Sequence, residues 1–593
     1  MIAPIGTGTL LVLGTWAIAV ALILMVGRFV PTLIEPSASR SLRVRASIWW
    51  GLGICLVLVL ALSLVTPLHS GLAALIFAGV VLILIILGVF LLRGRTGTRR
   101  ISMSRGAWIL RITLAFVVTY LAFKALGPAT NYDTGLYHLG AIKYASDFHS
   151  IPGLANLFIP FGYANGQFPM AAFLGNGPWG QEGFRLLNGL MICLVAVELF
   201  LRIRSRKWSW GTFTLLAGVA GTFIPLIAIA DFWVTSPTSD TSILLLTLIA
   251  VAYLCDYLGS VSGRSINASV VLITITVMIA LRPTMIFFAA TALVVVVGVQ
   301  VVRISRGVQS SSRAGFIAAG VLALLVGGLQ IARDYVLSGW LMYPLSLHRF
   351  SVDWAASDPV DTRNATLAAA RDYSTTDGYY TAHSWDWIPL WFSRLWSQWE
   401  TYFFLLGCLM AVAALIAAYV AGQRVPARRL IICMLPSLVA VLAWFTVSPP
   451  SYRFIWGPLF TIFLIPLGAG LAAIHRSDAR ISSRIAPLVL AAACAVLVLV
   501  TGFSAIARNQ VSTVTESRVF ELAGISLGYA VSPMPVVETQ DLNLESGLVA
   551  RTPITGDQCW DVYPLCTFYP ERSLGLRGPN LQDGFMVSQV PTP

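Results

Sequence analysis

Residues 131–180 read NYDTGLYHLGAIKYASDFHSIPGLANLFIPFGYANGQFPMAAFLGNGPWG. This segment lies between two apolar runs, yet it carries two histidines, two aspartates and a lysine, among them Asp133, His138 and Lys143. Such polarity is dense for a segment so close to lipid, and a plain connection between two membrane spans would be shorter. We therefore expect the chemistry of the protein to lie in this segment, held at one face of a membrane.

The composition of the chain explains why a membrane is expected. Of the 593 residues, 57% are hydrophobic and 11% are charged, whereas a soluble protein carries roughly 25% charged residues. The net charge of +13 does not indicate a nucleic-acid partner, because the basic residues are spread over short loops rather than gathered on one surface. The sequence predicts an all-α polytopic membrane protein whose environment is the lipid bilayer.

Apolar runs long enough to cross a bilayer, roughly 17 to 25 residues each, recur along the whole chain. We expect about fourteen membrane spans. They fall near residues 9–30, 47–67, 71–93, 107–127, 183–203, 210–231, 241–259, 266–281, 284–303, 314–332, 400–420, 429–447, 455–474 and 485–505. Arg282 and Pro283 separate a short run from the next one, so this pair of spans could be broken or tilted.

The distribution of Arg and Lys predicts the orientation of the spans. Basic residues cluster in alternate loops, near residues 40–45, 93–105, 202–207, 303–313, 424–429 and 476–484. Loops with a positive charge stay in the cytoplasm. Both termini, the loops 128–182 and 333–399, and the tail 506–593 should therefore be extracytoplasmic.

Three regions follow from this layout. Residues 1–106 could form an accessory transmembrane module, because the polar segment comes only after the fourth span. Residues 107–505 would form the transmembrane core with its two outer loops, which should bear interfacial helices. Residues 506–593 would form a small extracytoplasmic C-terminal region.

Asp133 is the candidate catalytic residue. It precedes a predicted helix, Leu136 to Phe148, whose aromatic residues recur at helical spacing. An Asp at this place is explained by N-capping alone, but at the mouth of a cavity it could also act as a general base. Both interpretations stay open from the sequence.

Further side chains at the predicted outer face are candidates for binding a substrate. A guanidinium can hold a phosphate through two hydrogen bonds, and a lysine can pair with a phosphate as a point charge, although each could also be an anchor in the lipid headgroups. Asp240 begins a span, where capping explains it equally well. The candidate substrate contacts are His138, Lys143, Asp240, Arg282, Arg333 and Arg453.

No metal site is predicted. The histidines of the first outer loop lack a ligand-like spacing, and the loop contains no paired acidic motif. The loop 333–399 is rich in Trp, which could stack on sugars or rest on lipid. In the tail, Cys559 and Cys566 form a candidate disulfide, which requires an oxidising compartment.

Several motifs together resemble a family of bacterial integral membrane proteins that in turn resembles the GT-C-type glycosyltransferases. They are Tyr132-Asp-Thr-Gly-Leu-Tyr-His138, Pro152-Gly-Leu-Ala-Asn156, Ser236-Pro-Thr-Ser-Asp240, Tyr343-Pro-Leu with Asp353-Trp354, Arg453-Phe454, and the tail from Cys559 to Cys566 followed by Leu576-Arg-Gly and Asp583-Gly-Phe. The resemblance covers most of the chain after about residue 110.

The resemblance implies a helical membrane enzyme that moves a sugar from a polyprenyl-phosphate donor to a cell-envelope glycan or lipid acceptor, at the outer face of the bacterial plasma membrane. Asp133 is the position that matches the base of the GT-C enzymes. Because the first outer loop lacks the paired acidic motif of the metal-using members, the need for a divalent metal stays open. Two alternatives remain, a transporter or flippase of lipid-linked glycans and a non-catalytic envelope assembly protein.

Overall fold

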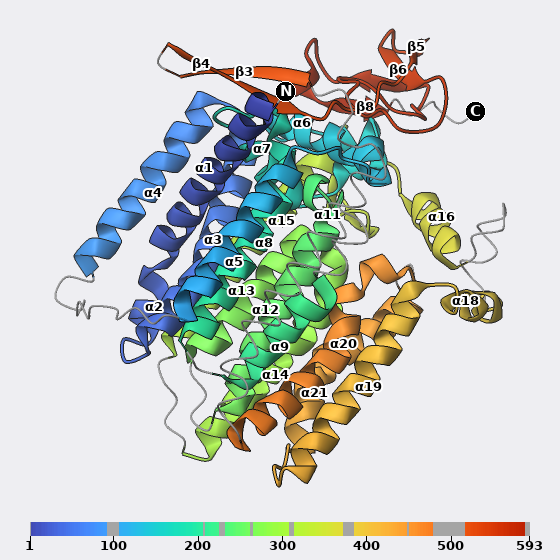
Figure 1. Cartoon of the computed structure of the whole chain (residues 1–593). Coiled ribbons are helices and arrows are strands. Elements are labelled where there is room, and N and C mark those ends of the chain that lie inside the picture. Colours follow the sequence, from blue (N-terminus) through green and yellow to red (C-terminus); the bar gives the residue numbers. More distant parts are fainter. Residues whose placement is uncertain are drawn as a thin grey trace.

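The computed structural model describes most of the chain (Figure 1). The described residues are 2–91, 106–205, 208–223, 232–260, 265–307, 313–371, 385–447, 450–477, 516–522 and 524–587. The predicted span at 485–505 lies outside them.

Helices dominate the fold, and every predicted apolar run that lies wholly or partly within the described residues contains one. These helices are α1 (Ile2–Gly27), α3 (Arg40–Val65), α4 (Gly71–Leu91), α5 (Gly106–Ala125), α8 (Leu187–Arg204), α9 (Trp210–Gly218), α12 (Ser239–Gly259), α13 (Ser265–Leu281), α14 (Ile286–Ser305), α15 (Ala314–Ser338), α19 (Trp399–Val420), α20 (Ala427–Thr446) and α21 (Trp456–Ser477). Within the described ranges, ten helices are long and apolar enough to cross a membrane. The multi-pass helical architecture is therefore confirmed.

The ten helices are fewer than the fourteen predicted spans. Within the described residues, α9 and α13 are apolar but shorter than a full span, and the run at 485–505 lies outside these residues. Pro283 has no backbone N–H to donate, so α13 stops at Leu281 and a 3₁₀ turn, η6 (Pro283–Met285), leads into α14. The expected break between these two runs is present.

Helix α12 lies at the centre of the bundle. It is apolar on every side and almost completely buried, as expected for a helix surrounded by other helices rather than by lipid. It packs against α9, α13 and α21. By contrast, α4 and α19 keep most of their apolar side chains exposed, so they form the lipid-facing surface.

The first helices share this core. Helices α1 and α3 approach closely where Gly27 meets Gly51, since a Cβ at Gly51 would lie 1.8 Å from the carbonyl oxygen of Ile23. The indole of Trp16 donates a hydrogen bond of 3.0 Å to the carbonyl of Leu186. The division at residue 106 stays a prediction, and the helices before it pack directly against the helices after it.

Short elements gather at one end of the bundle. After α5 come η1 (Thr134–His138), α6 (Leu139–Asp147), η2 (Leu154–Asn156), η3 (Ile159–Gly162), α7 (Gln167–Phe173) and η4 (Gly180–Arg185); after α15 come β1 (Trp340–Met342), β2 (Leu347–Arg349), α16 (Val360–Arg371) and α18 (Ile388–Leu395); η7 (Tyr452–Phe454) precedes α21. The predicted helix at 136–148 is confirmed as the η1–α6 helix. Its Lys143 and Tyr144 are buried beneath the tail rather than turned to lipid.

The tail covers the same end with β-hairpins, which the sequence analysis did not predict. Strands β3 (Glu516–Leu522) and β4 (Ile525–Val531), β5 (Thr539–Asn543) and β6 (Val549–Pro553), and β7 (Leu574–Leu576) and β8 (Phe585–Val587) form three antiparallel pairs. Strand β4 packs against α1, and Arg185 donates a 2.6 Å hydrogen bond to the carbonyl of Ser532. Strand β8, the last described strand, and the start of α1 both lie at this end of the molecule (Figure 1).

Candidate functional site

A cavity of about 660 Å³ opens at the end of the bundle that the tail covers. Its walls come from η1, from the loop through η2 and η3, from the first turn of α12, from α16, from η7 and from the tail. The charged and polar residues that line it include Asp133, His138, Asn156, Thr238, Ser239, Asp240, Arg282, Ser357, Thr362, Thr366, Arg453, Asp557 and Glu571. Five of the predicted substrate or catalytic residues thus meet in one place.

Two ion pairs stand side by side in this cavity. Arg453 donates to the carboxylate of Asp133 over 2.5 Å. Arg282 donates to the carboxylate of Asp240 and to the hydroxyl of Ser239. The four charges come from elements that are far apart in the sequence, and together they cancel.

The ring of Phe454 brings the two guanidinium groups together. The guanidinium carbon of Arg453 lies 4.8 Å from the centre of this ring, and that of Arg282 lies 5.5 Å from it. Both distances fit a cation–π contact. The Nη1 group of Arg282 is buried and has no hydrogen-bond partner within the described residues. The site therefore offers two cations and an unused donor to a ligand.

The backbone explains how these side chains reach the cavity. Thr238 caps α12 by accepting a hydrogen bond from the backbone N–H of Asp240, and its hydroxyl also donates 2.9 Å to the Asp240 carboxylate. Arg282 has an extended backbone between the end of α13 and Pro283, as expected for a residue before proline. Asp240 is thus fixed at the start of α12, and Arg282 directly follows the end of α13.

The structure distinguishes between the two interpretations of Asp133. Its side chain makes no capping hydrogen bond to η1. Instead, Asn131 accepts from the backbone N–H of Asp133 over 3.1 Å, and the Asp133 carboxylate lines the cavity. Capping therefore does not account for this aspartate.

His138 lies beside the ion pairs as a neutral imidazole. It is 3% exposed, and its Nδ1 atom has no hydrogen-bond partner in the part of the chain that the structure describes. Burial lowers the pKa of His138 to about 4, although Asp133 and Asp240 act in the opposite direction. At neutral pH it can accept one hydrogen bond from a ligand and donate another.

Arg453 remains a cation in the cavity. Burial alone would lower the pKa of its guanidinium, but the carboxylates of Asp133 and Asp240 raise the pKa above its ordinary value. Arg453 thus keeps its positive charge at any physiological pH, and in this structure Asp133 balances that charge.

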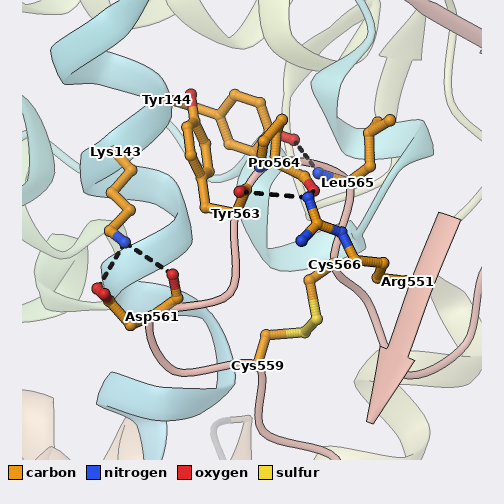
Figure 2. Close-up of a disulfide and its surroundings, with 9 residues drawn as sticks. All are labelled: Lys143, Tyr144, Arg551, Cys559, Asp561, Tyr563, Pro564, Leu565 and Cys566. Atoms are coloured by element: carbon orange, nitrogen blue, oxygen red, sulfur yellow. Dashed lines mark hydrogen bonds and ion pairs between the residues drawn. A yellow bond between two sulfur atoms is a disulfide. The ribbon is translucent and has the colours of Figure 1, made fainter. Parts of the chain in front are cut away.

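Two of the predicted substrate contacts lie elsewhere. Lys143 pairs with Asp561 of the tail, with 2.6 Å between its Nζ and the carboxylate and 2.9 Å to the backbone carbonyl (Figure 2). Arg333 is buried in α15 and faces Gln330, next to a smaller space under the loop that contains Tyr163. Neither side chain lines the large cavity, so of the three candidate arginines only Arg282 and Arg453 meet there.

Several residues of the cavity are not among those predicted from the sequence. Tyr137 and Tyr163 line its wall, and the tail contributes Asp557, Tyr569 and Glu571. No tryptophan in the described part of the loop 333–399 lines the cavity. The aromatic spacing that includes Tyr137 predicts only a helix, and the sequence motifs of the tail do not include Asp557, Tyr569 or Glu571.

The predicted disulfide is present, and it joins Cys559 to Cys566. Figure 2 shows that this small loop packs against α6, where the backbone N–H of Leu565 donates 3.2 Å to the hydroxyl of Tyr144. Just before the loop, Gln558 donates 2.7 Å to the carbonyl of Tyr132. The disulfide-closed loop therefore holds the segment that carries Asp133.

Removing this disulfide should loosen the tail. Closing so short a loop stabilises the folded state by about 2 to 3 kcal/mol on the chain-entropy model. We expect Cys559→Ser with Cys566→Ser to increase amide exchange at Leu565 and Trp560 by roughly 30- to 150-fold. Hydrogen exchange followed by mass spectrometry measures these exchange rates. The control is Cys408→Ser in α19, which removes a thiol but no disulfide. Unchanged exchange would show that packing alone holds the loop.

The described residues contain no group of three His, Cys, Asp or Glu side chains that could hold a metal ion. The need for a divalent metal therefore stays an open prediction. The carboxylates of Asp133 and Asp240 are both engaged by arginines.

Comparison with known proteins gives one match. A family model described as "Domain of unknown function (DUF8201)" matches residues 10–460, a range that includes Asp133, Asp240, Arg282 and Arg453 and ends before the tail. No curated protein and no solved structure matches the chain. Since the match covers more than half of its length, the chain belongs to the family described as a domain of unknown function (DUF8201).

Proposed function

We propose that this protein is a membrane glycosyltransferase of the GT-C type. It would move a sugar from a polyprenyl-phosphate donor to a cell-envelope glycan or lipid acceptor, at the outer face of a bacterial plasma membrane. The observation that supports this proposal best is the pair of arginines, Arg282 and Arg453, held against one aromatic ring in a cavity at the end of a membrane bundle.

The arginine pair suits the phosphate of a lipid-linked sugar. Guanidinium groups hold phosphate oxygens through strong, charge-assisted hydrogen bonds. The unused Nη1 donor of Arg282 supplies one such bond without breaking any contact in the protein. Arg453 can supply another when the phosphate displaces the carboxylate of Asp133.

An apolar extension of the cavity suits the lipid chain. A smaller cavity of about 90 Å³ shares Thr366 and Phe454 with the large one and continues between α14 and α20. Its walls are mainly apolar, with Met285, Phe287, Ala440, Ala443, Trp444 and Ile455. A lipid phosphate bound at the arginines would thus direct its first isoprene units between two membrane helices.

The part of the cavity wall that the tail contributes suits a carbohydrate acceptor. It includes the exposed aromatic side chain of Tyr569 and the carboxylates of Asp557 and Glu571. Aromatic faces stack on the apolar faces of sugars, and carboxylates accept hydrogen bonds from sugar hydroxyls. The tail would therefore contribute to the choice of acceptor.

The proposed reaction exchanges one bond at the sugar. The acceptor oxygen forms a bond to the anomeric carbon while the bond between that carbon and the phosphate oxygen breaks, and Asp133 takes the proton of the acceptor hydroxyl. The bonding electrons leave with the polyprenyl phosphate, whose growing negative charge Arg282 and Arg453 stabilise. Because the phosphate competes for Arg453, its binding would release Asp133 to act as a base.

The proposal is tested by a release assay with the purified full-length protein in lipid vesicles. A panel of polyprenyl-phosphate-linked pentoses and hexoses is offered together with envelope glycan acceptors. We expect at least one donor to be cleaved to polyprenyl phosphate and a lengthened acceptor. Movement of intact donor between the leaflets without cleavage would instead identify a flippase.

The orientation of the protein is the next prediction. Because basic loops alternate so regularly, a reporter fused to the C-terminus should be extracytoplasmic. A reporter inserted in the turn between α19 and α20, near Arg424, should be cytoplasmic. Paired alkaline phosphatase and fluorescent-protein fusions measure both positions. A cytoplasmic C-terminus would place the cavity on the wrong side for an extracytoplasmic acceptor.

A further inference from the structure

A second cavity lies where α20 begins and α21 ends. Figure 1 shows that these helix ends lie at the end of the bundle away from the tail. It has a volume of about 400 Å³ and is formed where α3, α12, α13, α20 and α21 begin or end. The residues that give it chemical character are Arg45, Trp208, Asp256, Asn267, Arg429 and Arg476. None of them belongs to the proposed glycosyl-transfer site.

Two buried polar groups of this cavity lack a partner. Asn267 is 5% exposed, and its Oδ1 atom has no hydrogen-bond partner among the described residues. The indole Nε1 of Trp208 is in the same situation. A buried polar group without a partner destabilises a fold, and in native proteins such a group is an exception that needs an explanation. A ligand that forms hydrogen bonds with both groups would explain why they have no partner among the described residues.

The buried charges next to the cavity balance one another. Glu198 is fully buried and accepts from Arg45 over 3.2 Å and from Arg202 over 2.6 Å. Arg202 also donates to Asp256 over 2.7 Å. Two guanidiniums thus face two carboxylates, and this network adds no net charge to the cavity.

The excess charge of the cavity is therefore positive. Arg429 begins α20 and Arg476 ends α21, and both side chains are exposed at the rim of the cavity. Neither forms an ion pair with any residue in the described ranges. Two guanidiniums without an ion pair in the described residues favour an anion at the mouth of the pocket, and the planar fork of each guanidinium suits phosphate oxygens.

We propose that this second cavity binds a phosphate group at the membrane face opposite the glycosyl-transfer site. Arg429 and Arg476 hold the phosphate oxygens at the rim, while Asn267 and Trp208 bind the polar groups that enter more deeply. Basic pockets between helix ends at a membrane face are typical sites for the headgroups of anionic lipids. The phosphate can come from such a headgroup or from a free phosphate compound, and the two sources are separable by experiment.

The test uses the full-length protein in detergent and titrates three probes. They are a short-chain phosphatidylglycerol, a phosphatidylcholine of the same chain length, and inorganic phosphate, with binding followed by native mass spectrometry. We expect saturable binding of phosphatidylglycerol that is weakened about tenfold or more by Arg429→Gln or Arg476→Gln. Saturable binding of inorganic phosphate with the same dependence would identify a free phosphate ligand.

A matched control separates the pocket from general surface charge. Arg428 is the exposed neighbour of Arg429 and does not line the cavity. Arg428→Gln removes the same charge from the same membrane face, so it should leave the binding unchanged. An equal loss with Arg428→Gln, equal affinity for phosphatidylcholine, or no saturable binding of any anionic probe would each overturn the proposal.

Asn267→Leu gives a test with a second readout. The substitution keeps a similar volume and removes the polar group that lacks a partner. We expect the probe-free variant to melt at a temperature no lower than the wild type, and the stabilisation that phosphatidylglycerol or phosphate gives the wild type to disappear. A lower melting temperature with the ligand effect retained would show that Asn267 serves the fold and not a ligand.

Discussion

Asp133→Asn is expected to fold like the wild type and to lose sugar transfer by about a hundredfold or more, the usual scale of general-base catalysis. The side chain keeps its size, and since Asp133 makes no capping hydrogen bond, η1 loses no cap. What disappears is the negative charge that would accept the proton of the acceptor hydroxyl. Because Arg453 is then free of its carboxylate partner, the binding of the donor phosphate should not weaken.

The loss should therefore fall on kcat and not on the KM for the donor. Initial rates at varied donor concentration measure both. Asp541→Asn, an exposed carboxylate of β5 outside the cavity, is the matched control and should behave like the wild type. Transfer at the wild-type rate with Asn at position 133 would exclude Asp133 as the base and leave His138, a neutral imidazole in the same cavity, as the next candidate.

The membrane helices could be predicted from the sequence because the bilayer imposes a length and an apolar composition on each of them. The tail could not be predicted in the same way. Its strands are three to seven residues long, and contacts with distant loops stabilise them. The contact between Gly153 and β8 is an example of such a distant contact. Gly153 has a positive φ, and a Cβ there would lie 2.2 Å from the carbonyl oxygen of Phe585. Only glycine therefore fits at this position.

Some of the charged residues of the candidate site could also be predicted from the sequence. Charged residues at the ends of membrane spans are costly and therefore informative, and this rule found Asp240, Arg282 and Arg453. It could not separate them from Arg333, which lies at the end of α15 but beneath another loop. Nor could it show that Lys143 is neutralised by Asp561, because that partner lies 418 residues further along the chain.

The segments on which the resemblance rests are also brought together by the fold. Asn156 donates to the carbonyls of Trp354 and Phe585 over 2.9 and 3.3 Å. Arg577 donates to the carboxylate of Asp353 over 2.8 Å. Motifs that are hundreds of residues apart in the sequence thus form one packed layer beside the cavity.

The proposed function requires Arg282 and Arg453 to bind the same phosphate. Arg453→Gln should weaken the binding of a polyprenyl-phosphate sugar by about 1.5 to 3 kcal/mol, or roughly 10- to 150-fold. Binding is measured with a fluorescent donor analogue in nanodiscs, independently of turnover. Arg363→Gln in α16 removes a guanidinium at the same end of the molecule but outside the cavity, so it should bind the donor normally.

The role of Arg282 must be tested with a double variant. Arg282→Gln alone would leave the carboxylate of Asp240, which is 4% exposed, as a buried charge without a partner. Such an unpaired charge is strongly destabilising, and poor folding of Arg282→Gln would say nothing about the donor. The double variant Arg282→Gln with Asp240→Asn removes both charges and should fold. We expect it to bind the donor as weakly as Arg453→Gln does, and the losses at the two arginines should not add, since both act on one phosphate. Donor binding at wild-type affinity in this folded double variant would show that Arg282 serves only to neutralise Asp240.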